Sequence, residues 1–169
     1  MAPRRSRTHR PSPPRLVYFE DLGGVYDAPI EVVWDFMEKD EEFHPKAHKS
    51  TVRNFKSKRL SEISIILRWE QREGPRWRKK FARMTEVRPS VRILEEIEGP
   101  DAGSQTVHIY RPKGNSTVVD VLSYRRSTID SPGQIRKKWL RKFASAYRED
   151  LPYFRAYARK VRSAKNKRA

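Results

Sequence analysis

The chain has 169 residues, enough for one domain with short tails, and it contains no cysteine. Lack of cysteine excludes a disulfide scaffold, thiolate zinc sites, iron–sulfur clusters and a cysteine nucleophile, and with only 4 histidines we expect no metal and no cofactor. Aromatic residues make up 11% of the chain, too many for a wholly disordered protein. No apolar run approaches the ~20 residues that span a bilayer, and the basic N-terminus lacks an apolar signal core, so we expect a cytoplasmic protein.

The net charge of +17 is concentrated at the two ends of the chain. Residues 1–15 hold five arginines and residues 155–169 hold seven cations, with no acidic residue in either stretch. We predict a disordered basic tail over 1–15, one domain over 16–162 and a basic C-terminal tail over 163–169. The tails either keep the protein soluble or make weak, salt-sensitive contacts with nucleic acid or another anionic surface.

The body begins with an expected strand over residues 16–26, in which Gly23-Gly24 suggests a bulge. Pro29 suits the first turn of a helix, where its missing N–H group costs nothing. The spacing i, i+3, i+4, i+7 then predicts one apolar helical face, formed by Ile30, Val33, Trp34 and Met37.

A second short helix is expected over residues 40–49, interrupted by Pro45. His44 and His48 lie four residues apart and would share a face of a regular helix, as metal ligands often do. No third ligand is adjacent to them, so a polar lining at a cavity mouth is a better interpretation than a metal site, and structural histidines that face a loop are the commonest outcome for such a pair.

Six runs with strand character follow, separated by short segments rich in Gly, Pro, Asn and Ser. Connections this short require antiparallel neighbours. With the first strand, they predict a seven-stranded antiparallel sheet whose later strands cover residues 51–56, 61–70, 77–87, 92–98, 106–111 and 117–124.

A long amphipathic helix is predicted to start at Pro132 and to run to about Val161. Ser131 can cap its first turn and Gln134 can complete a capping box. Pro152 predicts a kink or a brief break near residue 150, because proline removes one helical hydrogen bond. The one large apolar helical face must then lie on the one large sheet, and a long helix across a strongly curved sheet leaves space beneath it.

This order of elements resembles the START and polyketide-cyclase-like (SRPBCC, helix-grip) superfamily. The best local match is the segment 25–36, VYDAPIEVVWDF, in which a strand ends in an Ala28-Pro29 step and a helix carries a Val33-Trp34 pair. The fold class implied is α+β, with a curved seven-stranded antiparallel sheet, two short helices after the first strand and a long C-terminal helix packed across the sheet.

The resemblance implies a deep cavity between the sheet and the C-terminal helix. Members of the superfamily bind lipids, sterols, polyketides, hormones or quinones there, some catalyse cyclisation or dehydration, and others act as chaperone co-factors. No catalytic signature of the family can be placed on individual residues of this sequence. Candidate ligand-binding residues, chosen as large side chains on the middle strands, the last two strands and the C-terminal helix, are Trp69, Phe81, Met84, Ile109, Leu122, Tyr124, Trp139 and Phe143.

The last two strands carry the candidate acid–base groups. A tight turn that pairs Lys113 with Ser116 places His108 on one face of the sheet and both Asp120 and Tyr124 on the other. The face of Asp120 is the more apolar one, and we therefore expect it to be the inner face. Asp120 is then either a polar anchor or general base in the cavity, or a carboxylate paired with Arg or Tyr or placed near the rim.

Three functions remain open at this point. The first is binding of an apolar or amphipathic small molecule, such as a lipid, polyketide or quinone-like compound, in the cavity. The second is a cyclase or dehydratase that uses His108, Asp120 or Tyr124 as acid and base. The third is a nucleic-acid-associated protein that acts through its basic ends. The absence of a clear acid–base constellation favours binding, and the sequence gives no oligomeric state.

Overall fold

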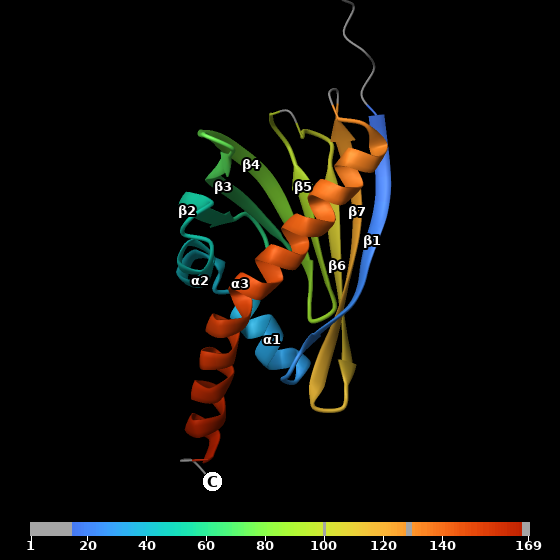
Figure 1. Ribbon diagram of the computed structural model, residues 1–169. Coiled ribbons are helices and arrows are strands. Elements are labelled where there is room, and N and C mark those ends of the chain that lie inside the picture. Colours follow the sequence, from blue (N-terminus) through green and yellow to red (C-terminus); the bar gives the residue numbers. More distant parts are fainter. Residues whose placement is uncertain (1–14, 100, 128–129, 167–169) are drawn as a thin grey trace, which may run out of the picture.

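A single antiparallel sheet of seven strands and three helices make up the computed structural model, which describes residues 15–99, 101–127 and 130–166 (Figure 1). The strand order across the sheet is β1-β7-β6-β5-β4-β3-β2, so each strand lies beside its neighbour in sequence except that β1 joins β7. The elements are β1 (Arg15–Tyr26), α1 (Ile30–Met37), α2 (Asp40–Ala47), β2 (Val52–Arg59), β3 (Ser64–Glu73), β4 (Arg76–Val87), β5 (Val91–Glu96), β6 (Gln105–Lys113), β7 (Ser116–Ser127) and α3 (Pro132–Asn166).

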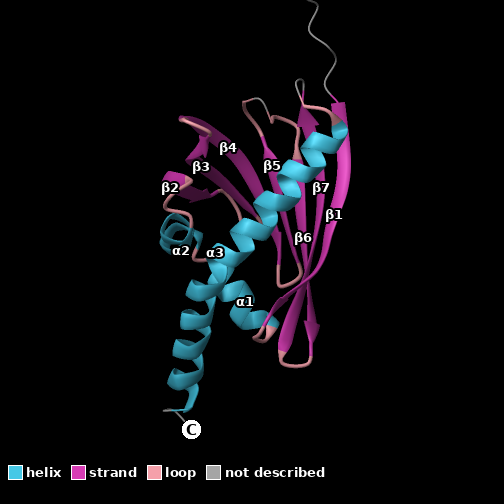
Figure 2. Cartoon of the chain, in the orientation of Figure 1, coloured by secondary structure: helices cyan, strands magenta, loops and turns pink. Residues whose placement is uncertain are grey.

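The helix α3 runs diagonally across the concave face of the sheet, and α1 and α2 lie against one end of that face (Figure 2). The sheet stays open, with β1 and β2 as its two edges. This arrangement confirms the predicted fold class. Within the described part of the chain, no helix is both long enough and apolar enough to cross a membrane.

The capping box that was predicted for α3 is present. Ser131 donates its backbone N–H to Oε1 of Gln134 at 2.8 Å, and the N–H of Gln134 points back to Oγ of Ser131 at 3.4 Å. The helix continues through Pro152 to Asn166, so of the two alternatives predicted near residue 150, a kink or a brief break, the break is absent, and the predicted end near Val161 is too early. Figure 1 shows that the helix axis changes direction about halfway along, so proline bends this helix without ending it.

The bulge predicted in β1 is also present, as a register shift between Asp21 and Gly24 in the pairing with β7. Gly23 has a φ of 79°, which favours glycine. A Cβ atom on Gly24 would meet Cγ1 of Val119 at 2.9 Å, so the close approach of β1 to β7 requires glycine there.

The main apolar core lies where α1 packs between the sheet and α3. Trp34 of α1 meets Tyr110 of β6 edge to face at 5.9 Å between ring centroids, and Tyr26 of β1 meets Phe154 of α3 at 4.9 Å. Of the predicted apolar face of α1, Ile30, Val33 and Trp34 are buried and Met37 is half-buried, and Phe36 is buried as well. This core fills only one end of the space between α3 and the sheet.

Candidate functional site

A cavity of about 770 Å³ occupies the rest of the space between α3 and the concave face of the sheet. The three helices and all seven strands contribute to its wall. Its apolar part includes Phe36, Phe43, Leu67, Met84, Leu94 and Phe143.

Five of the predicted site residues line this cavity, and they come from β3, β4, β6 and α3. They are Trp69, Met84, His108, Trp139 and Phe143. The other five, Phe81, Ile109, Asp120, Leu122 and Tyr124, lie on the convex face of the sheet, so the structure does not bring the two groups together.

The register of β6 and β7 is the predicted one, with Lys113 opposite Ser116 and His108 opposite Val121. The assignment of the inner face is wrong, because His108 and Val121 point into the cavity. Side chains alternate between the two faces of a strand, so Asp120 and Leu122 point away from it. The convex face is the more apolar of the two along these strands, although no described helix covers it (Figure 1).

Asp120 and Tyr124 have structural partners on the convex face. Asp120 pairs with Arg111 and accepts a hydrogen bond of 2.9 Å from the N–H of Gly23, so it holds the bulge of β1. The ring of Tyr124 packs against that of Tyr18 at 4.8 Å between centroids and a tilt of 40°, and Tyr124 is 42% exposed. These contacts match the interpretation of Asp120 as a carboxylate paired with arginine.

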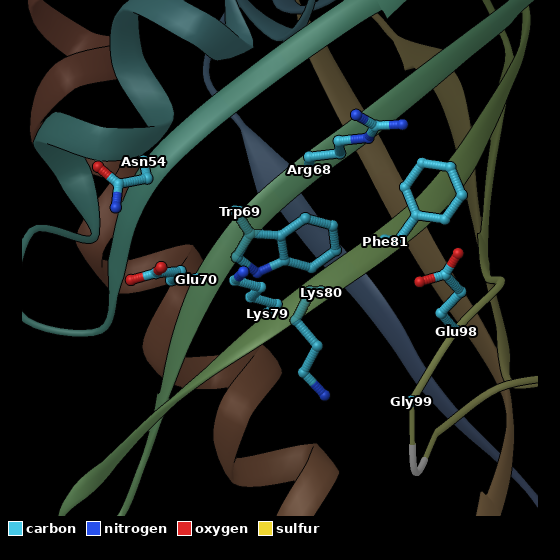
Figure 3. Close-up of a pocket in the computed structure, with 9 residues that line it drawn as sticks. All are labelled: Asn54, Arg68, Trp69, Glu70, Lys79, Lys80, Phe81, Glu98 and Gly99. Carbon is cyan, nitrogen blue, oxygen red and sulfur yellow. The ribbon is translucent and has the colours of Figure 1, made fainter.

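Phe81 lies beside a smaller hollow of about 400 Å³ at β3 and β4, which Figure 3 shows in close-up. The guanidinium of Arg68 stands 4.9 Å from its ring centroid. Phe81 and Met84 are three residues apart on one strand, and this odd spacing places them on opposite faces. They could therefore not both line the main cavity.

Charged side chains that sequence reasoning did not single out are buried in the cavity wall. Arg92 of β5 donates from Nε to Glu86 at 3.1 Å and from Nη2 to Asp40 of α2 at 2.6 Å. Burial opposes the charge of Arg92, but the nearby carboxylates outweigh it and raise the pKa of its guanidinium. The sequence signal that could have identified Arg92 was a positively charged residue at every-second-residue spacing within a strand that was predicted to be buried.

His108 faces the cavity from the middle of β6, directly opposite Arg92 on β5. Its ring makes no hydrogen bond to any side chain or backbone group in the described ranges. Burial, together with the positive charges of Arg92 and Arg125, lowers the pKa of His108 to about 4. At neutral pH the ring is therefore uncharged, and it offers the cavity one donor and one acceptor.

His48 closes the cavity at the end formed by α2 and α3. Its Nδ1 lies 2.7 Å from Oε2 of Glu149 and its Nε2 lies 3.0 Å from Oδ1 of Asp150, so both ring nitrogens face carboxylates. Burial opposes the charge, but the two carboxylates outweigh it and raise the pKa of His48. His44 packs against His48 at 4.5 Å, and both line the cavity, which agrees with the interpretation of the pair as a polar lining. No group of three His, Cys, Asp or Glu side chains with metal-binding geometry occurs in the residues that the structure describes.

The opposite end of the cavity wall holds a cluster of charges around an indole ring, here called the basic cluster: Lys80, Glu96, Arg125, Trp139 and Lys142. Arg125 is 2% exposed and donates to Oγ of Ser123 at 3.0 Å and to the hydroxyl of Thr106. Its guanidinium carbon lies 3.4 Å from the centroid of the Trp139 ring, and Nζ of Lys142 lies 4.3 Å from the same centroid.

No protein-family model matches the sequence, and the search of curated proteins gives no significant match. Solved structures do match. The di-domain ARO/CYC StfQ from the steffimycin biosynthetic pathway has a TM-score of 0.70 at 12% identity, over 88% of this chain and 52% of that one. The di-domain ARO/CYC BexL from the BE-7585A biosynthetic pathway has a TM-score of 0.67 at 13% identity, over 85% and 50%. The chain thus spans about half the length of these two proteins.

Two single-domain structures match over nearly their whole length. The Zhui aromatase/cyclase from Streptomyces sp. R1128 has a TM-score of 0.66 at 13% identity, over 89% of this chain and 98% of that one. Ara h 8.0201 has a TM-score of 0.66 at 8% identity, over 84% and 99%. At such low identities the likeness concerns the fold alone: the chain has the helix-grip fold of these neighbours.

Proposed function

We propose that this protein binds an apolar or amphipathic small molecule in the cavity between α3 and the sheet. The observation that carries the proposal is the cavity itself, whose volume of about 770 Å³ lies within the range of ordinary ligand sites. Burial of the ligand against side chains such as Met84 and Phe143 supplies the affinity, and the polar groups of the wall orient it.

The similar solved structures support ligand binding in the cavity, but they do not specify the ligand. Three of those described above are named aromatase/cyclases or ARO/CYC proteins, so a compound of polyketide type is one candidate for the ligand. Lipids and quinone-like compounds are further candidates for a cavity of this size.

A pair of variants at adjacent positions of β7 tests the binding proposal. Val121 faces the cavity and Leu122 faces the convex side, so Val121→Trp fills the cavity and Leu122→Trp does not. In a titration with the neutral dye Nile red, we expect Val121→Trp to weaken binding by about tenfold or more and Leu122→Trp to stay within about twofold of the wild type.

The Nile red titration and native mass spectrometry together test the binding proposal. Equal Nile red affinity in both variants would show that the dye does not enter the cavity, and the proposal would fail. Native mass spectrometry of freshly purified protein gives an independent measurement, in which a co-purifying small molecule should be present in the wild type and depleted in Val121→Trp.

The second candidate is a cyclase or dehydratase, and His108 is the observation that favours it. An uncharged imidazole without a protein partner, facing a cavity, can take up a proton from a bound substrate. A pKa near 4 makes it a weak base at pH 7, however, which is why binding is our first proposal. Dehydration of a β-hydroxy ketone by the wild type, lost in His108→Leu and kept in Asp120→Asn, would establish the enzyme; no turnover by the wild type contradicts it.

A further inference from the structure

The basic cluster contains two buried polar atoms that lack hydrogen-bond partners among the described residues, Nη1 of Arg125 and Oε2 of Glu96. These two side chains form an ion pair, but Nη1 stands 3.8 Å from Oε1 of Glu96, too far for a hydrogen bond. Buried polar atoms are nearly always paired, because an unpaired one gives up its hydration without compensation. Both side chains belong to the cavity wall.

The charges of this cluster leave an excess cation. Lys80 is held by Asp101 at 2.6 Å and by Glu73 at 3.0 Å, and Glu73 also binds Arg78 at 2.9 Å. The four cations Arg78, Lys80, Arg125 and Lys142 therefore face three carboxylates, those of Glu73, Glu96 and Asp101. Glu96 then remains as the carboxylate that faces both Arg125 and Lys142, and Lys142 makes no ion pair within the described part of the chain. Two cations therefore share one carboxylate in a wall that is largely shielded from water.

The ionisation of these groups reflects the same shortage of negative charge. Burial lowers the pKa of Arg125 to about 10, and burial followed by the charges of neighbouring lysines lowers the pKa of Lys142. Burial also raises the pKa of Glu96, which weakens its hold on Arg125 further. A bound anion would satisfy both cations, and it would compensate for the shortage.

We propose that the ligand carries a carboxylate, which binds Lys142 and Arg125 at the basic cluster while its apolar body extends along the cavity. This inference rests on the proposed function and specifies the chemistry of the ligand. The half-buried Lys142 is the accessible member of the pair. Arg125 lies against the Trp139 ring, so a headgroup reaches Nη1 only when the indole moves aside. The fluorescence of Trp139 should therefore change when the headgroup binds.

The test compares three ten-carbon probes that differ only in their headgroup: decanoate, 1-decanol and decylamine, titrated at pH 7 and low salt by displacement of Nile red. We expect decanoate to bind the wild type about tenfold more tightly than 1-decanol, as one charge-assisted hydrogen bond would give, and decylamine to bind least tightly. Tryptophan fluorescence should change with decanoate and much less with 1-decanol.

Variants locate the headgroup. Lys142→Met and Arg125→Met should each reduce the ratio of the decanoate affinity to the 1-decanol affinity from about tenfold towards one. Lys137→Met, an exposed lysine of the same helix, is the matched control and should keep the wild-type preference. If Arg125→Met fails to fold, Lys142→Met carries the test alone.

The outcomes separate this inference from the proposed function. If decanoate and 1-decanol bind the wild type equally, or if the preference survives in Lys142→Met, the cavity binds ligands but the carboxylate proposal is overturned. If none of the three probes displaces Nile red, the binding proposal fails together with it.

Discussion

In an ordinary half-buried sheet the inner face carries apolar side chains and the outer face carries polar ones. In this sheet the inner, concave face carries many charged side chains and the outer, convex face carries exposed aromatic ones. The concave face buries charged side chains, among them Glu86, Arg92 and Arg125, which are 2%, 5% and 2% exposed. The convex face leaves Tyr18 and Tyr124 in contact with solvent. Curvature and the position of α3 therefore decide which face is inside, whereas the count of apolar side chains does not.

This difference indicates what the concave face is for. Burying a charge is costly unless it is paired, and a solid apolar core avoids that cost. A wall that surrounds a ligand instead needs polar groups within reach of it, held in place by partners such as the Arg92–Glu86 pair. The contrast between the faces can be tested by removing matched groups from each.

The largest effect is expected from Arg92→Met on the concave face. Loss of the guanidinium leaves Asp40 and the buried Glu86 with fewer partners, so we expect the free energy of unfolding to fall by about 3 kcal/mol. Urea denaturation measures the change. The control, Arg111→Met, removes the partner of Asp120 on the convex face and should cost less than about 1 kcal/mol. Equal losses would remove the energetic distinction between the faces.

The pH dependence of stability gives the next effect, through His108. Its folded pKa of about 4 lies below the unfolded value of 6.5, so as the pH falls from 6.5 to 4 the unfolded chain takes up a proton that the folded chain does not. This histidine should therefore destabilise the wild type by up to about 2 kcal/mol at pH 4.5 and by nothing at pH 8. His108→Leu should lose less stability between those pH values; an identical decline would show that His108 is well hydrated.

His48 should act with the opposite sign. Its folded pKa is raised, so its contribution is present below the unfolded pKa and is lost as the pH rises through the folded pKa. The wild type should then lose about 1 kcal/mol on passing from pH 6 to pH 9, and His48→Gln should lack this loss. Thermal unfolding at the two pH values measures it, and a loss of equal size in the variant would contradict the pairing of His48 with Glu149 and Asp150.

The smallest effect is expected from Asp120→Asn on the convex face. The variant weakens the pair with Arg111 and keeps an oxygen to accept from Gly23, so stability should change by less than about 1 kcal/mol. Nile red affinity should equal that of the wild type. A tenfold weaker affinity would place Asp120 functionally in the cavity, against its position in the structure.

The elements could be predicted from the sequence because their signals are local. The Ser131-Pro132 start of α3 and the Gly23-Gly24 bulge each depend on residues a few positions apart. The inner face could not be predicted, because both faces of β6 and β7 carry apolar side chains and only the path of α3 distinguishes them. The ion pair between Arg92 and Asp40, which joins residues 52 positions apart, leaves no local pattern either.

The strand order also has a consequence for the newborn chain. β1 is made before β7, which is its neighbour among the described strands and begins 90 residues after β1 ends. At a synthesis rate of about 5–20 residues per second, β1 stays without this pairing partner for roughly 5–18 s. During that time its unpaired edge, with Leu16 and Tyr18, is a template for pairing between chains. Four arginines precede this strand in the sequence, and such a composition of like charges discourages pairing between chains while translation proceeds.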